Sequence, residues 1–163
     1  MTRITVEKAV LTAIMATWVV ALPPVGYQSG ISAGGDIWLH LIYMYSHANV
    51  WHMTGNLFVL WVMKDRLYLV PAMVTAFTAS YLPSWSAYGD IGLTMGFSGV
   101  LFAIAGIKWG RHIRKADNRK AVVMIFCRKV LPFAFVGLVL PHVNWCLHLY
   151  CLIGGLLYGR CRR

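Results

Sequence analysis

Charged side chains are scarce in this chain, which limits the kinds of protein it can be. They make up 12% of its 163 residues, about half of the roughly 25% typical of soluble domains. Because a chain of this size exposes much of its surface, a core cannot hide the shortage. Hydrophobic residues reach 59%, and the mean hydropathy is +0.63. The composition excludes an ordinary water-soluble domain and predicts a protein whose solvent is the lipid bilayer.

Motifs for metal, redox and nucleic-acid chemistry are also missing. The four cysteines form no CxxC pair. His47, His52 and His148 could ligate zinc, but HExxH is absent and no acidic residue lies within an apolar stretch to activate water. The net charge of +10 suggests nucleic acid, yet the basic residues lie between and beyond apolar segments, as topology signals do. We expect no metal, no cofactor and no nucleic-acid partner.

Long apolar segments dominate what is present. A spanning helix needs about 20 mainly apolar residues. The sequence predicts helices over approximately residues 9–27, 50–63, 67–81, 98–108, part of 121–140, and 144–158. No repeat or linker divides them. We therefore expect an all-α polytopic membrane protein, with six transmembrane helices bundled in one domain over residues 1–163.

The distribution of Lys and Arg predicts the orientation of these helices. Loops at about 28–49, 82–97 and 141–143 contain neither residue. The remaining connections and both termini are basic, and six spans place them all on one side, which the positive-inside rule makes cytoplasmic. Arg128 and Lys129 depart from this pattern, and either a later start of the fifth helix or snorkelling would accommodate them. We expect a multi-pass protein of the cell (inner) membrane with both termini cytoplasmic.

The loop after the first helix is unusually apolar. It opens with glycines and continues as Ile-Trp-Leu-His-Leu-Ile-Tyr over residues 37–43. Trp and Tyr are favoured at the boundary between lipid and water. We therefore expect this loop to lie in, or dip into, the outer interface.

Four polar side chains fall at similar depths within the predicted helices. Counting from each basic helix end at about 1.5 Å per residue gives heights of ~15 Å for Ser98, ~18 Å for His148, ~18 Å for His52 and ~12 Å for Asn56. Polar groups inside lipid are costly and by default suggest function. Small residues at near four-residue spacing would let the fourth and sixth helices approach closely. These are Gly99, Ala103 and Gly106, and Cys151, Gly155 and Gly159.

A serine and a histidine brought together could carry out nucleophilic catalysis. Ser98 would attack and His148 would take its proton, while His52, Asn56 and the Ser98 amide could donate to an oxyanion. No acidic residue lies within a predicted span, so the serine chemistry would use a dyad. Taken singly, a membrane serine more often bonds to the carbonyl one turn earlier, and a histidine is more often a packing residue. Their shared depth favours the catalytic interpretation.

Three sequence elements together resemble the rhomboid intramembrane serine proteases. They are His47-x4-His52-x3-Asn56 in the second helix, Gly96-Phe97-Ser98-Gly99 opening the fourth, and His148 followed by glycines in the sixth. Their order and spacing match over roughly residues 38–159. The resemblance implies the minimal six-helix bacterial-type core.

By this resemblance, Ser98 is the nucleophile and His148 its base. His52 and Asn56 would help to stabilise the oxyanion, and His47 would hold the first loop against the second helix. Gly96 and Gly99 would give the nucleophile its tight turn and open space. An aromatic residue at Phe102 would stack on the catalytic histidine.

Three positions depart from the family pattern. Trp38 is followed by Leu39, where many members have arginine. The hydrogen bonds that an arginine would make there are therefore absent. Phe102 can stack but lacks a tyrosine hydroxyl. Cys151 stands where glycine is common and would slightly widen the gap between the fourth and sixth helices. None of these removes a catalytic group, and their effect on activity stays open.

The resemblance implies an endopeptidase that hydrolyses peptide bonds in or near transmembrane segments of membrane-protein substrates, single-pass or other. A non-catalytic rhomboid-like protein that binds or escorts membrane clients is the alternative, although such members usually lack the serine or the histidine. A small transporter is a third class. It is disfavoured because no charged residue lies within the spans and no repeat is evident.

Overall fold

The computed structural model describes residues 3–21, 36–63, 67–84, 93–135 and 143–162, and every regular element among them is a helix. The all-α prediction is therefore confirmed for this part of the chain. The helices are α1 (Arg3–Ala21), α3 (Ile37–Ile42), α4 (Val50–Val62), α5 (Leu69–Ala79), α6 (Ser98–Lys115), α7 (Arg119–Lys129), α8 (Leu131–Ala134) and α9 (Trp145–Cys161). Within the described ranges, none of them combines the length and the apolar character needed to cross a membrane.

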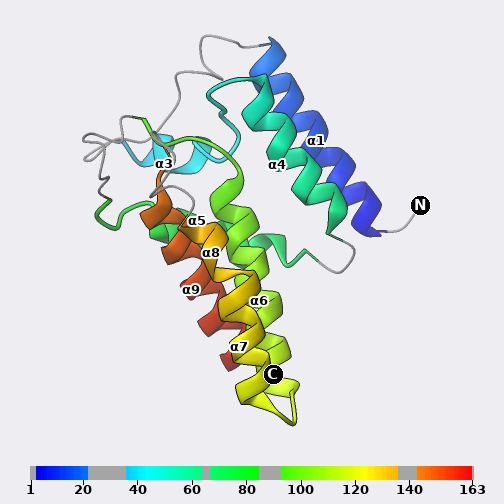
Figure 1. Cartoon of the computed structure of the whole chain (residues 1–163). Coiled ribbons are helices and arrows are strands. Elements are labelled where there is room, and N and C mark those ends of the chain that lie inside the picture. The colour runs from blue at the N-terminus through cyan, green and yellow to red at the C-terminus, as the bar shows by residue number, and fades with distance from the viewer. Residues whose placement is uncertain (1–2, 22–35, 64–66, 85–92, 136–142, 163) are drawn as a thin grey trace.

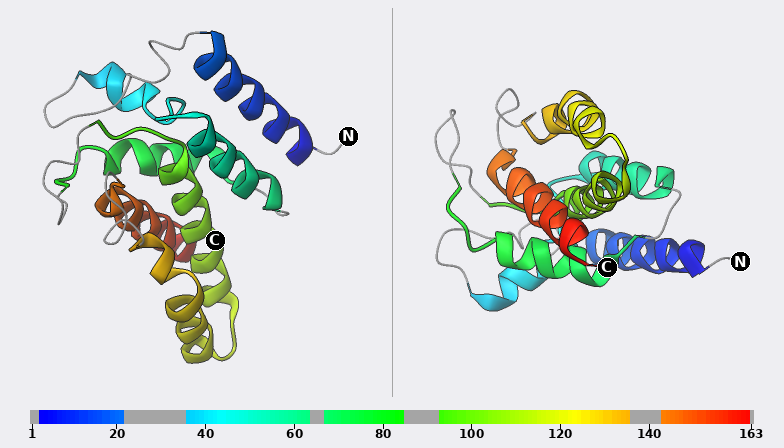
Figure 2. Two further views of the ribbon diagram at one scale, coloured as in Figure 1. Left: turned by 45° about the horizontal axis from the view of Figure 1, so that its top comes forward. Right: turned by 90° about the horizontal axis from the view of Figure 1, so that it is seen from below.

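The helices form two groups (Figure 1). α1 lies beside α4, and α6 lies beside α9. Figure 2 shows α5 on one side of α9, and α7 with α8 on the other. The short helix α3 lies near one end of α5. This arrangement brings the start of α6 and the start of α9 to the same end of the second group.

Several helix boundaries differ from the sequence-based predictions. The fourth helix continues past Lys108 to Lys115, because Lys and Arg are good helix formers and their charge does not end a helix. It ends at Ala116, whose backbone is extended. The predicted second and third helices, at 50–63 and 67–81, correspond closely to α4 and α5. The sixth helix continues three residues beyond 158, to Cys161.

The predicted first and fifth helices need larger corrections. α1 begins at Arg3, six residues before the predicted start, and residues 22–27 lie outside the described ranges. The fifth helix begins at Arg119, where the Asn118 side chain caps it by accepting from the Ala121 amide at 3.1 Å. It breaks at Val130, and Pro132, which has no amide hydrogen, lies in the short α8. Residues 136–140 of the prediction lie outside the described ranges.

The structure also places the two basic residues of the fifth helix and the apolar loop after the first helix. Arg128 and Lys129 lie exposed in the last turn of α7, before the break, instead of inside one continuous fifth helix. The apolar loop after the first helix contains a short helix, α3, whose Trp38 is 70% exposed. Its apolar side chains are therefore only partly covered by the rest of the described chain.

α6 and α9 pack with their backbones in direct contact. A Cβ added at Gly106 would overlap the Leu152 carbonyl, and one at Gly155 would overlap the Ala103 carbonyl. One turn deeper, Gly110 and Gly159 meet the carbonyls of the opposite helix in the same way. Glycines four residues apart on both helices thus interlock, as small residues do where membrane helices approach closely. This interlock fixes how far α6 can slide along α9.

A buried lysine joins α1 to the end of α4. Lys8 is 5% exposed, and its ammonium donates to the carbonyl of Trp61 at 3.0 Å and to that of Met63. The Trp61 indole in turn donates to the Thr12 hydroxyl at 3.0 Å. A cation at the carboxyl end of a helix satisfies its last carbonyls and favours its dipole. Lys8 is thus a structural cap as well as a basic residue near the N-terminus.

Candidate active site

Ser98 and His148 meet where α6 and α9 begin. Ser98 is the first residue of α6, and His148 lies in the first turn of α9. The Nε2 atom of His148 is 2.9 Å from Oγ of Ser98, although fifty positions separate the two residues in sequence. Both side chains are partly buried. An imidazole nitrogen at this distance can accept the proton of the serine hydroxyl.

The His148 ring is held by stacking and not by a second hydrogen bond from the described residues. Phe102, one turn after Ser98, stacks on it with ring centroids 4.5 Å apart and an interplanar angle of 26°. The other ring nitrogen, Nδ1, is buried and has no hydrogen-bond partner in the described part of the chain. Nδ1 would carry the proton while Nε2 accepts from Ser98. The stack is therefore the observed contact that orients the imidazole.

His47 and Asn56 form a buried hydrogen-bonded pair. Nδ1 of His47 lies 3.0 Å from the Tyr45 carbonyl, which can only accept, so Nδ1 carries the hydrogen. Nε2 must then accept, and the Asn56 amide nitrogen donates to it at 3.0 Å. This pair joins the turn after α3 to the middle of α4. It also means that both His47 ring nitrogens are occupied, which argues against a role as a metal ligand.

Gly96 lies directly against His52 and Asn56, with no room for a side chain between them. Its φ of +121° lies in the region that side chains rarely adopt. An added Cβ would be 2.7 Å from His52 Cε1, 2.8 Å from His52 Nε2 and 3.4 Å from Asn56 Nδ2. The Gly96 amide donates to the Tyr43 carbonyl at 2.9 Å. The backbone two residues before Ser98 is thus anchored, and it lies against two potential hydrogen-bond donors, His52 and Asn56.

Gly99, the residue after Ser98 in α6, packs against the Cys151 side chain of α9. Cys151 is fully buried, and its sulfur is 3.3 Å from the point where a Cβ on Gly99 would lie. The expected widening at Cys151 still leaves the helix backbones in contact one turn deeper, at Ala103 and Gly155. Since Gly99 has no side chain, the sulfur fits between the helices at this level.

Sequence reasoning missed two groups that hold the site together. Tyr43 is fully buried, and its hydroxyl donates to the Ala76 carbonyl of α5 at 3.0 Å, while its own carbonyl anchors Gly96. Asn144 caps α9 by accepting from the Leu147 amide at 3.0 Å. The only sequence signal for Asn144 was an asparagine directly before an apolar helix, which is a common N-cap. For Tyr43 there was no local signal, because its partners lie far away in the sequence.

The described residues contain no group of three or more His, Cys, Asp or Glu side chains that could hold a metal ion. Ser98 and His148 supply a nucleophile and a base, and His52 and Asn56 lie against the backbone that leads into Ser98.

Comparison with known proteins identifies the family. The model of the Rhomboid domain matches residues 34–163, which include every site residue discussed above. No curated protein and no solved structure matches the chain. Proteins of this family are membrane proteins and are generally intramembrane serine proteases, although non-catalytic members exist. Because the match spans most of the sequence, the chain belongs to the rhomboid family.

Proposed function

We propose that this protein is an intramembrane serine endopeptidase that hydrolyses peptide bonds in or near transmembrane segments of other membrane proteins. The observation that carries the proposal is the 2.9 Å contact between Ser98 Oγ and His148 Nε2. Two helices that begin far apart in sequence bring a hydroxyl and an imidazole into hydrogen-bond distance. A packing role alone would not require this contact, since either side chain could satisfy itself locally.

The reaction follows from the positions of these groups. Ser98 Oγ attacks the substrate carbonyl carbon while its proton passes to Nε2 of His148. His148 then gives this proton to the leaving amine, which breaks the C–N bond and leaves an acyl group on Ser98. A water molecule, deprotonated by His148 in the same way, attacks the acyl carbon. The bond from that carbon to Ser98 Oγ breaks, His148 returns the proton to Oγ, and the carboxylic acid leaves. The stack with Phe102 keeps the ring in place through both steps.

Three donors are available for the negative charge that forms on the carbonyl oxygen. Ser98 is the first residue of α6, and the first amides of a helix have no acceptor within it. His52 and Asn56 lie against Gly96, two residues before Ser98. Asn56 has one amide hydrogen bonded to His47 and keeps the other for an oxyanion. Donors fixed in advance stabilise such charge most effectively.

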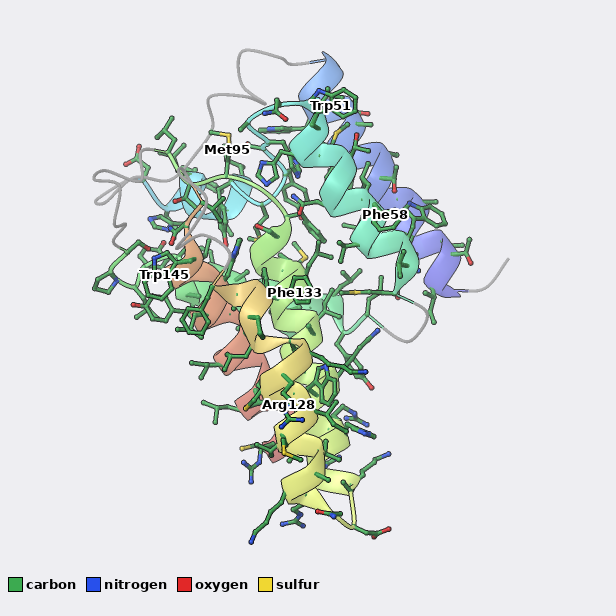
Figure 3. The ribbon with its side chains drawn as sticks, in the orientation of Figure 1. Trp51, Phe58, Met95, Arg128, Phe133 and Trp145 are labelled. Carbon is green, nitrogen blue, oxygen red and sulfur yellow. The ribbon has the colours of Figure 1, made fainter. Side chains whose placement is uncertain are left out.

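We also propose that the chain forms a single multi-pass domain in the cell membrane, with both termini cytoplasmic and transmembrane proteins as substrates. Large apolar side chains project outward from α4, as Figure 3 shows for Trp51 and Phe58, which are 80% and 68% exposed. Water would not favour such a surface, whereas lipid would. The end of α6 away from Ser98 has Arg114 and Lys115 in its last turn, as expected of a cytoplasmic end. Substrate helices would have to unwind near Ser98 to expose a carbonyl.

A fluorophosphonate probe tests the proposal, because it reacts with activated serines. We would label purified wild-type protein, Ser98→Ala and His148→Ala in detergent, and measure unfolding of each to establish that it is folded. We expect labelling of the wild type only. His148→Ala is the informative variant, since it keeps the serine and removes only the base.

Cleavage of model single-pass membrane proteins in liposomes is a second measurement. Ser98→Ala serves as the inactive control. Folded wild-type protein that neither labels nor cleaves would rule out the protease proposal and favour the client-binding alternative. Equal labelling of wild type and His148→Ala would show that His148 is not the base.

A further inference from the structure

Asn144 joins three segments that are remote in the sequence. Its Oδ1 accepts from the Leu147 amide at 3.0 Å, which caps α9. Its amide nitrogen has two hydrogens, and these go to the Thr94 hydroxyl at 2.9 Å and the Ser84 hydroxyl at 3.0 Å. The Asn144 carboxamide therefore has all its hydrogen atoms in use. One side chain holds the start of α9, the segment after α5 and the segment before α6.

The bond between Asn144 and Thr94 lies next to the Ser98–His148 contact. Thr94 precedes Ser98 by four residues, and Asn144 precedes His148 by four. The Asn144 carbonyl also accepts from the His148 amide at 3.3 Å, so Asn144 closes the helical turn that carries the base. Two parallel connections thus join the same pair of segments, one through the reacting groups and one just outside them.

The start of α6 needs such an external attachment. Its N-cap position is Phe97, and no side chain caps the helix there. The segment that leads into Ser98 is instead attached to its surroundings at the Gly96 amide, which donates to Tyr43, and at the Thr94 hydroxyl. The backbones of α6 and α9 come into contact about one turn further along, at Ala103 and Gly155. Among the described residues, only the Thr94 bond and the Ser98–His148 contact are side-chain hydrogen bonds between the start of α9 and the stretch that leads into α6.

We propose that Asn144 and Thr94 are positioning residues, which hold the start of α6 against the start of α9 so that Ser98 and His148 stay within proton-transfer distance. The inference rests on the proposed protease function and adds residues to its machinery. Neither residue touches the reacting atoms. Their contribution is to the alignment of the dyad, where displacements of about 1 Å can cost as much as a hundredfold in rate.

The decisive variants distinguish the effect of the Thr94 hydroxyl from the effect of the rest of that side chain. Thr94→Val removes the hydroxyl at nearly constant shape, whereas Thr94→Ser keeps it. Asn144→Ser preserves a capping oxygen for α9 but is too short to reach Thr94. Thr78→Val is the matched control, since the partners of the Thr78 hydroxyl among the described residues are carbonyls of its own helix, α5, at 3.0 Å.

The readout is fluorophosphonate labelling, resolved into the maximal rate constant at saturating probe and the probe concentration that gives half of it. We expect Thr94→Val and Asn144→Ser to lower the maximal rate constant by on the order of tenfold, with half-saturation unchanged. Thr94→Ser should stay within about twofold of wild type, and Thr78→Val should match wild type.

Two results would overturn the inference while leaving the protease proposal intact. One is a Thr94→Val rate equal to that of Thr78→Val, and the other is an equal loss in Thr94→Ser, which would show that the hydroxyl is not the cause. If Asn144→Ser fails to fold, the Thr94 variants decide alone. An unlabelled wild type would overturn the protease proposal, and the positioning role would fall with it.

Discussion

The imidazole of His47 accepts a hydrogen bond of 3.0 Å from the carboxamide of Asn56, nine residues further along the chain. Its other nitrogen donates to the Tyr45 carbonyl, so the ring is neutral and its tautomer is fixed. His47 has no exposed surface. A second proton would have to go to Nε2 and would displace Asn56. The neutral form of His47 is therefore part of how Asn56 is oriented.

This pair predicts a pH dependence of stability. Burial, with a smaller effect of the neighbouring His52, lowers the pKa of His47, which lies before α4, from 6.5 to about 4. Between these values the unfolded chain binds a proton that the folded chain excludes, so stability is complete above pH 6.5 and falls as the pH drops toward 4. The loss attributable to His47 would be about 3 kcal/mol. Unfolding of wild type and His47→Gln across this range measures it, and an equal slope in both proteins would contradict it.

Gly96→Ala should inactivate the protein more than it destabilises it. The backbone at φ +121° would strain an alanine by about 1–3 kcal/mol. The new methyl would also lie 2.7 Å from His52 Cε1 and 3.4 Å from Asn56 Nδ2, so it would displace the proposed oxyanion donors. We expect fluorophosphonate labelling to fall by at least tenfold while most of the protein stays folded. Gly55→Ala is the control, because a Cβ there meets nothing within 4 Å. Normal labelling of Gly96→Ala would show that the placement of His52 beside Gly96 does not matter for activity.

Phe102→Leu should slow labelling through the loss of its ring. Stacked aromatic pairs contribute about 0.5–1.5 kcal/mol beyond burial, and Phe102 lies 4.5 Å from the His148 ring. If this energy is lost from the transition state, the labelling rate should fall by roughly twofold to tenfold. Phe102→Tyr keeps the ring and should label at close to the wild-type rate. Equal rates in the Leu and Tyr variants would mean that stacking does not orient His148.

Gly106→Ala should destabilise the helix pair strongly. Its methyl would overlap the Leu152 carbonyl, which is backbone and cannot rotate away as a side chain can. We expect a loss of at least about 3 kcal/mol, at the upper end for overpacked cores. Gly55→Ala should instead be neutral or stabilising by up to about 1 kcal/mol, since alanine favours helix. Denaturant titration in detergent compares the two, and similar midpoints would argue that α6 and α9 are not in close contact.

Much of the site could be anticipated because the polar residues stand out against an apolar background. Depth along the helices placed Ser98 and His148 near each other, and the structure brings their side chains to 2.9 Å. Small-residue spacing likewise indicated that Gly106 and Gly155 lie in a helix contact, where the structure has them. In each case the signal is local to one helix.

The features that escaped prediction depend on contacts between distant segments. Gly110 belongs to the helix interlock, but a fourth helix that ended at Lys108 could not include it. The bond from Asn144 to Thr94 joins segments fifty residues apart, which a local pattern cannot indicate. Lys8 was interpreted through its charge alone, whereas the structure buries it as the cap of α4.

The interlock of α6 and α9 has a genetic consequence. When an oversized side chain meets another side chain, a smaller partner residue can restore the fit. At Gly106 and Gly155 the obstacle is a peptide carbonyl, at Leu152 and at Ala103, and all twenty amino acids carry one. No substitution at either facing position can make room. A search for intragenic suppressors of Gly106→Ala should therefore recover reversion to glycine and no compensating change at Leu152.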